Sequence, residues 1–167
     1  FTISMILGVV SLILMILVNK KNRELLNINV KELVLINEMS MTIGLVMLTI
    51  GNFLGGMWAN ESWGRYWGWD PKETWALISI MVYAFVIHMR LIPGLKSNFA
   101  FTVASILSFG SIIMTYFGVN FYLAGLHSYA KDDQEISLVF ISITLLIILI
   151  LSLLAYPKYK KYLKNNR

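Results

Sequence analysis

The chain has 167 residues, of which 57% are hydrophobic and 14% are charged, whereas soluble domains carry about 25% charged residues. With a mean hydropathy of +0.70, this composition excludes an ordinary soluble domain and predicts an all-α integral membrane protein with a single membrane domain. Cysteine is absent, which excludes disulfides and thiolate metal ligands.

Five apolar segments have about the length that a membrane-spanning helix needs. We expect spans at about 3–18, 33–54, 72–91, 99–117 and 135–156, outer loops at 55–71 and 118–134, and a basic tail at 157–167. The first span lacks the basic segment and the small-residue cleavage site of a secretory signal. Because the chain starts at Phe1 without a Met, already beside a helix, we expect a fragment of a longer protein or a processed one.

Glycines recur in the second predicted span. Gly51 and Gly55 form a small-xxx-small pair, which predicts the close approach of another helix. The alternative is that these glycines leave room for the edge of a flat ligand, and we favour helix packing. In the fourth span, Ala100, Ala104 and Ser108 recur every fourth residue and predict a second close-packing stripe.

All five tryptophans lie within the 18 residues 58–75, hereafter the Trp-rich segment. They are Trp58, Trp63, Trp67, Trp69 and Trp75. Indoles anchor helices at membrane surfaces, which needs only one or two of them. Five indoles interleaved with glycines also suit a surface that stacks against a large planar molecule. The residues alone leave both interpretations open.

The third span has a well-specified start. Asp70 has the spacing of an N-cap, Pro71 suits the first helical position, and Glu73 completes a capping box. The two acids therefore either cap this helix or take part in proton chemistry, and we favour capping.

The basic residues predict the orientation of the chain. Eleven of the 14 Lys and Arg lie in 19–32, 90–97 and 157–167, and the other three are Arg65, Lys72 and Lys131. The eleven are expected to face the cytoplasm, which places the C-terminus inside and the Trp-rich segment outside. The net charge of +5 is then a feature of topology and lipid headgroups, and no nucleic-acid partner is expected.

The two histidines are expected at opposite membrane faces. His88 lies 17 residues past Pro71, roughly 26 Å along a helix, whereas His127 lies in the second outer loop. They cannot bind one metal ion, because metal–imidazole bonds are only about 2 Å long. Each could be a metal or haem ligand. Otherwise, His88 would cap carbonyls or meet lipid phosphate, and His127 would be solvated.

The string Trp63-Gly-Arg-Tyr-Trp67-Gly-Trp69-Asp70 resembles the "WWD" signature of the haem-handling membrane proteins of cytochrome c biogenesis. The longer stretch from Gly55 to Leu77 resembles the CcsA/ResC type, the membrane half of the system II cytochrome c synthase (haem lyase). The resemblance covers roughly residues 40 to 130. The related CcmC and CcmF proteins share the Trp core but differ after the Asp.

This resemblance implies that the chain binds haem b non-covalently and presents it to the Cys-x-x-Cys-His segment of an apocytochrome c. It implies haem contacts for Trp58, Trp63, Gly64, Tyr66, Trp67, Trp69 and Asp70, and axial ligation of the iron by His88 in the membrane and by His127 outside. Each family histidine has an upstream partner histidine, and this chain has no other His. Those partners lie before Phe1, or this chain cannot complete either site.

The resemblance further implies a CcsB/ResB-type partner, separate or fused upstream, and a location in a bacterial inner membrane or a thylakoid. Two other functions are open to a polytopic protein of this kind: a haem-binding subunit of a respiratory complex, and a small-solute transporter. Paired histidines at both faces would favour the first, and more intramembrane polar groups than Glu38 and His88 would favour the second. No nucleophile–base pair indicates hydrolysis, and no Gly-rich loop indicates nucleotide binding.

Overall fold

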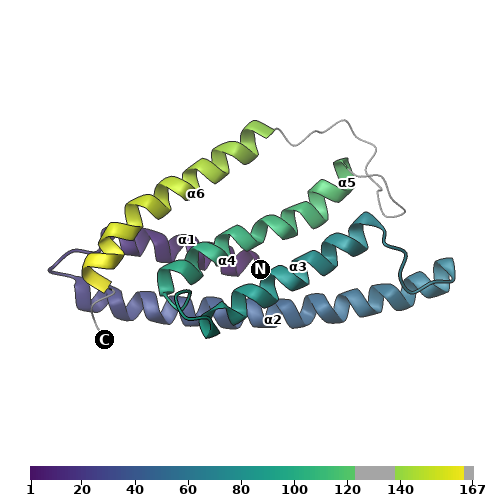
Figure 1. Cartoon of the computed structure of the whole chain (residues 1–167), viewed down its shortest axis with the longest axis horizontal. Coiled ribbons are helices and arrows are strands. Elements are labelled where there is room, and N and C mark those ends of the chain that lie inside the picture. The colour runs from purple at the N-terminus through teal and green to yellow at the C-terminus, as the bar shows by residue number, and fades with distance from the viewer. Residues whose placement is uncertain (123–137, 164–167) are drawn as a thin grey trace.

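The computed structural model describes residues 1–122 and 138–163, and every regular element in these ranges is helical (Figure 1). The elements are α1 (Thr2–Leu17), α2 (Arg23–Trp63), α3 (Pro71–His88), the 3-10 turn η1 (Met89–Leu91), α4 (Asn98–Ile113), the π-helical η2 (Met114–Gly118), α5 (Val119–Tyr122), α6 (Leu138–Lys158) and the π-helical η3 (Tyr159–Leu163). The all-α prediction is confirmed.

Four helical stretches within the described residues are long and apolar enough to cross a bilayer. They are Arg23–Trp63, Pro71–Leu91, Asn98–Gly118 and Ile141–Leu163. α1 is apolar but has 16 residues, about 24 Å of helix, which is shorter than the roughly 30 Å hydrocarbon core. The chain is a multi-pass membrane protein, and α1 is the one predicted span whose helix falls short of the spanning length.

Helix α2 differs most from the sequence prediction. It runs for 41 residues, whereas the sequence predicted a linker before residue 33 and a loop from residue 55. The polar character of 23–32 indicated a linker, but polarity does not end a helix. Val30, Val34, Asn37 and Met41 are buried at helical spacing, so the helix is stabilised by one continuous packed face. It ends at Trp63, because Gly64 adopts the left-handed conformation.

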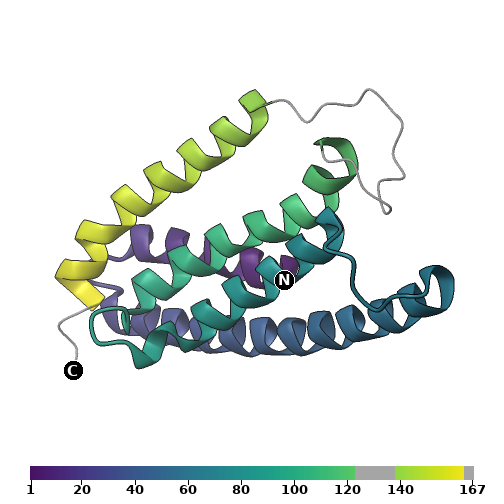
Figure 2. The ribbon, with the colours of Figure 1, turned by 45° about the vertical axis from the view of Figure 1, so that its right-hand side comes forward.

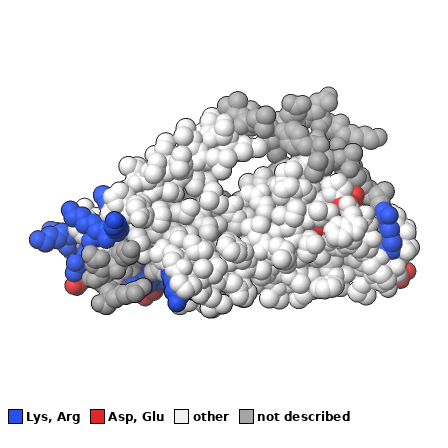
Figure 3. All heavy atoms as spheres, in the orientation of Figure 1, with Lys and Arg blue, Asp and Glu red and all other residues white. Residues whose placement is uncertain are grey.

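The helices form a bundle with two distinct ends (Figure 1). The α1–α2 turn, the α3–α4 link and the end of α6 lie at one end, which we call the basic end. The α2–α3 connection and α5 lie at the other, which we call the Trp end. In Figure 3 the Lys and Arg side chains gather mainly at the basic end. Among the described residues, the two groups of basic side chains that the sequence predicted on opposite sides of the membrane are thus separated along the bundle.

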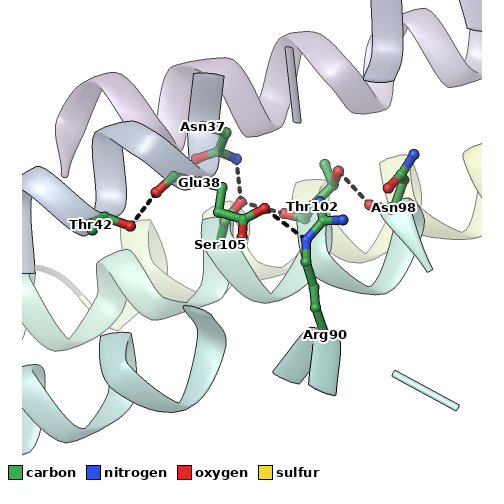
Figure 4. Close-up of polar contacts among 7 residues, drawn as sticks. All are labelled: Asn37, Glu38, Thr42, Arg90, Asn98, Thr102 and Ser105. Carbon is green, nitrogen blue, oxygen red and sulfur yellow. Dashed lines mark hydrogen bonds and ion pairs between the residues drawn. The ribbon is translucent and has the colours of Figure 1, made fainter. Parts of the chain in front are cut away.

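Helix α1 lies in the centre and packs against α2, α4 and α6, while α3 packs against α2 and α4. The Ser4 hydroxyl donates to Asn37 Oδ1 (2.5 Å), and Asn37 Nδ2 donates to Ser105 Oγ (2.9 Å; Figure 4 shows this second bond). These buried bonds join α1, α2 and α4. A Cβ atom at Gly8 would lie 2.7 Å from Ile106 Cγ1, so glycine is required where α1 and α4 meet.

The intramembrane acid Glu38 has a partner. Arg90 in η1 places its Nε 2.9 Å from Glu38 Oε2 (Figure 4). The guanidinium of Arg90 also lies 4.5 Å from the centroid of the Phe101 ring. This ion pair joins α2 to the end of α3, and it accounts for an acidic residue within an apolar helix without a role in proton transfer.

Candidate functional site

The turn from α2 to α3 shapes the Trp-rich segment. Gly64 follows the last helical residue with φ at 71°, and its N–H donates to Asn60 O at 2.8 Å. This left-handed geometry is easy for glycine because it has no Cβ atom. Trp69 also has a positive φ, at 56°, which is uncommon for a side chain of its size. The chain therefore reverses direction between Trp63, where α2 ends, and Pro71, where α3 begins.

The predicted capping box is present. Asp70 is the N-cap of α3 and its carboxylate accepts from the Lys72 backbone N–H at 3.2 Å. Glu73 Oε2 accepts in return from the Asp70 N–H at 3.3 Å, and also from the Gly68 N–H at 2.8 Å. Pro71 occupies the first turn. Glu73 thereby ties the loop to the helix, so the two acids have a structural role in holding the Trp-rich segment.

A second close contact within the same loop is between Arg65 and Gly68. A Cβ atom at Gly68 would lie 2.7 Å from Arg65 Cζ and 2.9 Å from Arg65 Nε. The Arg65 side chain thus packs directly over the Gly68 backbone. A larger residue at position 68 would displace this guanidinium.

Four of the five indoles form two perpendicular pairs. The ring centroids of Trp58 and Trp63 are 5.1 Å apart at an interplanar angle of 80°, and those of Trp67 and Trp69 are 5.8 Å apart at 87°. Such edge-to-face contacts are favoured by the ring quadrupoles. Trp58, Tyr66 and Trp69 keep 53%, 64% and 72% of their surface exposed. The segment therefore offers separate aromatic faces rather than one flat surface.

A cavity of about 370 Å³ opens between α2 and the start of α3. Its volume lies within the range of small-molecule sites, roughly 300–1,000 Å³. On α2 it is lined by Gly51, Gly55, Gly56 and Trp58, and across from them by Tyr66, Trp67, Lys72 and Thr115, among others. Glycines, aromatic rings and polar side chains thus line the same cavity.

The glycines of this cavity bear on both sequence interpretations. No heavy atom lies within 4 Å of a Cβ added at Gly51 or at Gly55. Within the described residues no helix packs against this face of α2, so the helix-packing interpretation of the pair stays a prediction. The open space agrees with the alternative, in which the glycines leave room for the edge of a flat ligand.

Two polar groups at the cavity can recognise a ligand. Trp67 Nε1 is buried and has no hydrogen-bond partner among the described residues. The Lys72 ammonium, also at the cavity, donates to Asn120 Oδ1 at a long 3.5 Å. A buried N–H without an acceptor is costly, and a ligand oxygen would relieve that cost. The cavity therefore suits a flat, mainly apolar molecule with an acceptor or anionic edge.

His88 does not line this cavity. His88 is the last residue of α3, is exposed, and has its Nδ1 2.7 Å from Ala84 O. His127 lies outside the described residues. Among the described residues no group of three or more His, Cys, Asp or Glu could hold a metal ion. Because it ends α3, next to the α3–α4 link, His88 lies toward the basic end of the bundle, the end opposite the Trp-rich segment, as the sequence predicted.

The predicted cofactor residues divide into three groups. Trp58, Tyr66 and Trp67 line the cavity. Trp63 and Trp69 pack edge-on against two of them, while Gly64 and Asp70 shape the turn and the helix start. The ligand roles of all these residues stay predictions.

Sequence reasoning raised Gly51 and Gly55 only as an alternative and missed the rest of the α2 wall and the α3 wall of the cavity. Leu48, Gly51, Asn52, Gly55 and Gly56 line it, and they recur at i, i+3, i+4, i+7 and i+8, the spacing of one helix face. A small and polar face inside an otherwise apolar helix is a recognisable signal of a ligand-facing wall. Lys72 and Thr115 carried no such signal, because their place depends on how α3 and η2 pack.

The fold and the cavity define a helical membrane protein that offers a glycine- and indole-lined site at one end of its helical bundle. Residues 1–127 match the model of the family described as "Cytochrome C assembly protein". The chain belongs to this family. Its role is therefore in cytochrome c biogenesis, as the sequence predicted, and the respiratory-subunit and transporter alternatives are not favoured.

Several curated proteins are similar to the chain. NrfI of Wolinella succinogenes is 53% identical over 137 residues, which are 82% of this chain and 15% of NrfI. The cytochrome c biogenesis protein CcsA of Cyanophora paradoxa is 51% identical over 88 residues, 53% of this chain and 27% of that protein. CcsA of Cuscuta reflexa is 48% identical over 102 residues, 61% of this chain and 33% of that protein. The chain thus spans a third or less of these relatives.

Substitutions at Asp70 separate capping from a role of its charge. Asp70→Asn should be nearly harmless, because Asn caps a helix about as well, whereas Asp70→Ala should cost on the order of 1 kcal/mol. The measurements are thermal unfolding of the purified protein and yield of mature cytochrome c. Equal loss of cytochrome yield in both variants, with unchanged unfolding of the Asn variant, would assign the carboxylate charge to ligand binding instead.

Proposed function

We propose that this chain holds haem b non-covalently in the cavity at the Trp end and positions it for attachment to an apocytochrome c. The observation that carries the proposal is the cavity itself, in which an open glycine face, two indoles and a buried, unpartnered N–H come together. The family membership of the chain supports the same ligand.

The residues at the cavity fit the parts of a haem. Gly51 and Gly55 leave space for the edge of a flat macrocycle, and the exposed faces of Trp58 and Tyr66 can stack on it. The Trp67 N–H and the Lys72 ammonium are suitable partners for the propionate carboxylates. Each part of the cavity thus has a complement on this one ligand.

Bound haem supplies vinyl groups, to which the thiols of a Cys-x-x-Cys-His segment add by forming C–S bonds while the thiol hydrogens saturate the double bonds. No oxidant is consumed in that addition. The residues of this chain orient the ligand and exclude water rather than act as acid or base. This agrees with the structural roles of Asp70 and Glu73 in the α3 cap.

Iron ligation and partners follow from the resemblance. We propose His127, in the predicted second outer loop, and His88, at the end of α3, as ligands of haem iron at two different sites. We also propose a CcsB/ResB-type partner, separate or fused, and a bacterial inner membrane or thylakoid as the location. Part of a haem lyase is the activity that this assembly implies.

Filling the cavity tests the proposal. Gly55→Leu should keep α2 helical, because nothing lies within 4 Å of the added Cβ, but should reduce bound haem and cytochrome c yield several-fold. Gly110→Leu is the matched control, because Gly110 on α4 also has open space around it and does not line this cavity. Haem content of the purified full chain is measured by its absorption spectrum. Normal haem in Gly55→Leu, or equal loss in both variants, would contradict the cavity as the haem site.

The charge distribution supports a cytoplasmic basic end. Single cysteines can be introduced without background because the chain has none. In intact cells, a cysteine at Ser62 should react with a membrane-impermeant thiol reagent and one at Asn166 should not. The opposite pattern of labelling would invert the proposed topology.

Substitution of the two histidines is expected to have different effects on haem content and on its rescue by imidazole. His127→Gly opens an axial position near the membrane surface, so added imidazole should partly restore cytochrome c yield. His88→Gly should leave the full-length protein with little haem, and imidazole should restore less, because the site is surrounded by protein and lipid. Haem content and cytochrome c yield are measured with and without imidazole. If both variants keep normal haem and yield, neither histidine is a ligand.

A further inference from the structure

A second cavity, of about 700 Å³, lies at the basic end between the start of α4 and the end of α6. Three lysines from three different elements reach it: Lys31 on α2, Lys96 in the α3–α4 link and Lys160 on η3. No acidic side chain is among the described residues that line it. The cavity therefore has a strongly positive rim, and it is separate from the site at the Trp end.

The start of α4 adds to this positive field. Ser97 caps the helix by accepting from the Ala100 N–H at 3.1 Å, and Ser97, Asn98, Phe99 and Ala100 all line the cavity. A helix N-terminus carries a partial positive charge. Together with the three lysines, it favours an anionic group.

An aromatic cluster forms the wall of the cavity. The Phe99 ring centroid lies 5.3 Å from that of Tyr156 and 5.8 Å from that of Tyr159. These contacts join the start of α4 to the end of α6. Tyrosines beside lysines are typical of the interface between headgroups and acyl chains.

Above this wall, α6 separates from α4. Near its end, α6 is held by Lys158 Nζ, which donates to Ile16 O of α1 at 2.6 Å. Towards the Trp end it diverges from α4 (Figure 2), and Figure 3 shows the surface hollowed between them. In the most apolar part of the helical stretch Ile141–Leu163, only 6% of the residues are buried. Ile143, Leu146 and Ile150 of α6 are about half exposed. An apolar groove thus continues from the positively charged cavity.

We propose that this cavity binds the phosphate headgroup of an anionic phospholipid whose acyl chains lie in the groove between α6 and α4. Charge complementarity with three lysines selects an anionic headgroup over a zwitterionic one. The continuous apolar groove selects a lipid over a soluble phosphate. The lipid would join α6 to the bundle where the protein itself provides little contact.

Photo-cross-linking tests this proposal on the full chain in phosphatidylcholine nanodiscs. A photoactivatable phosphatidylglycerol should label residues of α4 and α6 more strongly than a matched photoactivatable phosphatidylcholine. The combined substitutions Lys31→Gln, Lys96→Gln and Lys160→Gln should lower the phosphatidylglycerol labelling about fivefold or more. The corresponding Lys→Arg substitutions keep the charge and should keep the labelling. Excess inorganic phosphate should not compete.

A control variant removes three other lysines, Lys20, Lys21 and Lys161, none of which lines the cavity. Its labelling should stay within about twofold of the unmodified protein. Several results would overturn the proposal: equal labelling by the two lipids, equal loss in both Gln variants, or full competition by inorganic phosphate, which would indicate a soluble phosphate site. An absence of labelling in the groove would show that another protein segment covers it.

Discussion

The buried amide of Asn37 is the contact on which the arrangement of the helices depends. Inside a bilayer, water offers no hydrogen bonds, and apolar side chains gain little by leaving lipid for protein. Helices are then held by small residues and by polar side chains that bond across helices. Asn37 uses both ends of its amide, accepting from Ser4 and donating to Ser105, so one residue of α2 sets the positions of α1 and α4. Glu38, the residue after Asn37, pairs with Arg90 just beyond α3, so this ion pair also joins the end of α3 to α2.

Once α2 is fixed in this way, it determines where the cavity at the Trp end lies. Its 41 residues extend about 60 Å, well beyond the roughly 30 Å of hydrocarbon. The same rigid helix therefore carries Asn37 in the interior, the glycine wall of the cavity, and Trp58 and Trp63 at its end. The first turns of α3, through Lys72, Glu73 and Ala76, supply the opposite wall. Two well-defined helix ends, rather than a mobile loop, thus position the indoles.

Local chemistry made the capping box of α3 accessible from the sequence, whereas the end of α2 at Gly64 was not predicted. Asp70, Pro71 and Glu73 specify a helix start through contacts within four residues, so their spacing was sufficient. The length of α2 was not predicted, because a polar stretch such as 23–32 has no helix breaker, and the packing of Val30 and Val34 decided its conformation. The role of Gly51 and Gly55 was also undetermined locally, since helix packing and ligand space require the same residues. The tertiary arrangement adds that no helix lies on that face among the described residues, which agrees with ligand space and leaves helix packing a prediction.

The separation of the two cavities constrains any account of haem handling by this chain. Lys31 and Gly51 both lie on α2 and line different cavities, and the 20 residues between them correspond to roughly 30 Å of straight helix, the thickness of a membrane core. His88 ends α3 toward the basic end, while the start of α3 forms the cavity at the Trp end. A haem ligated by His88 is therefore a different haem, or the same haem at a different time, from one held beside Trp67. A single static haem site that used both ends of the bundle is therefore geometrically excluded, and the proposed haem ligation by His88 would require a second site, separate from the cavity at the Trp end.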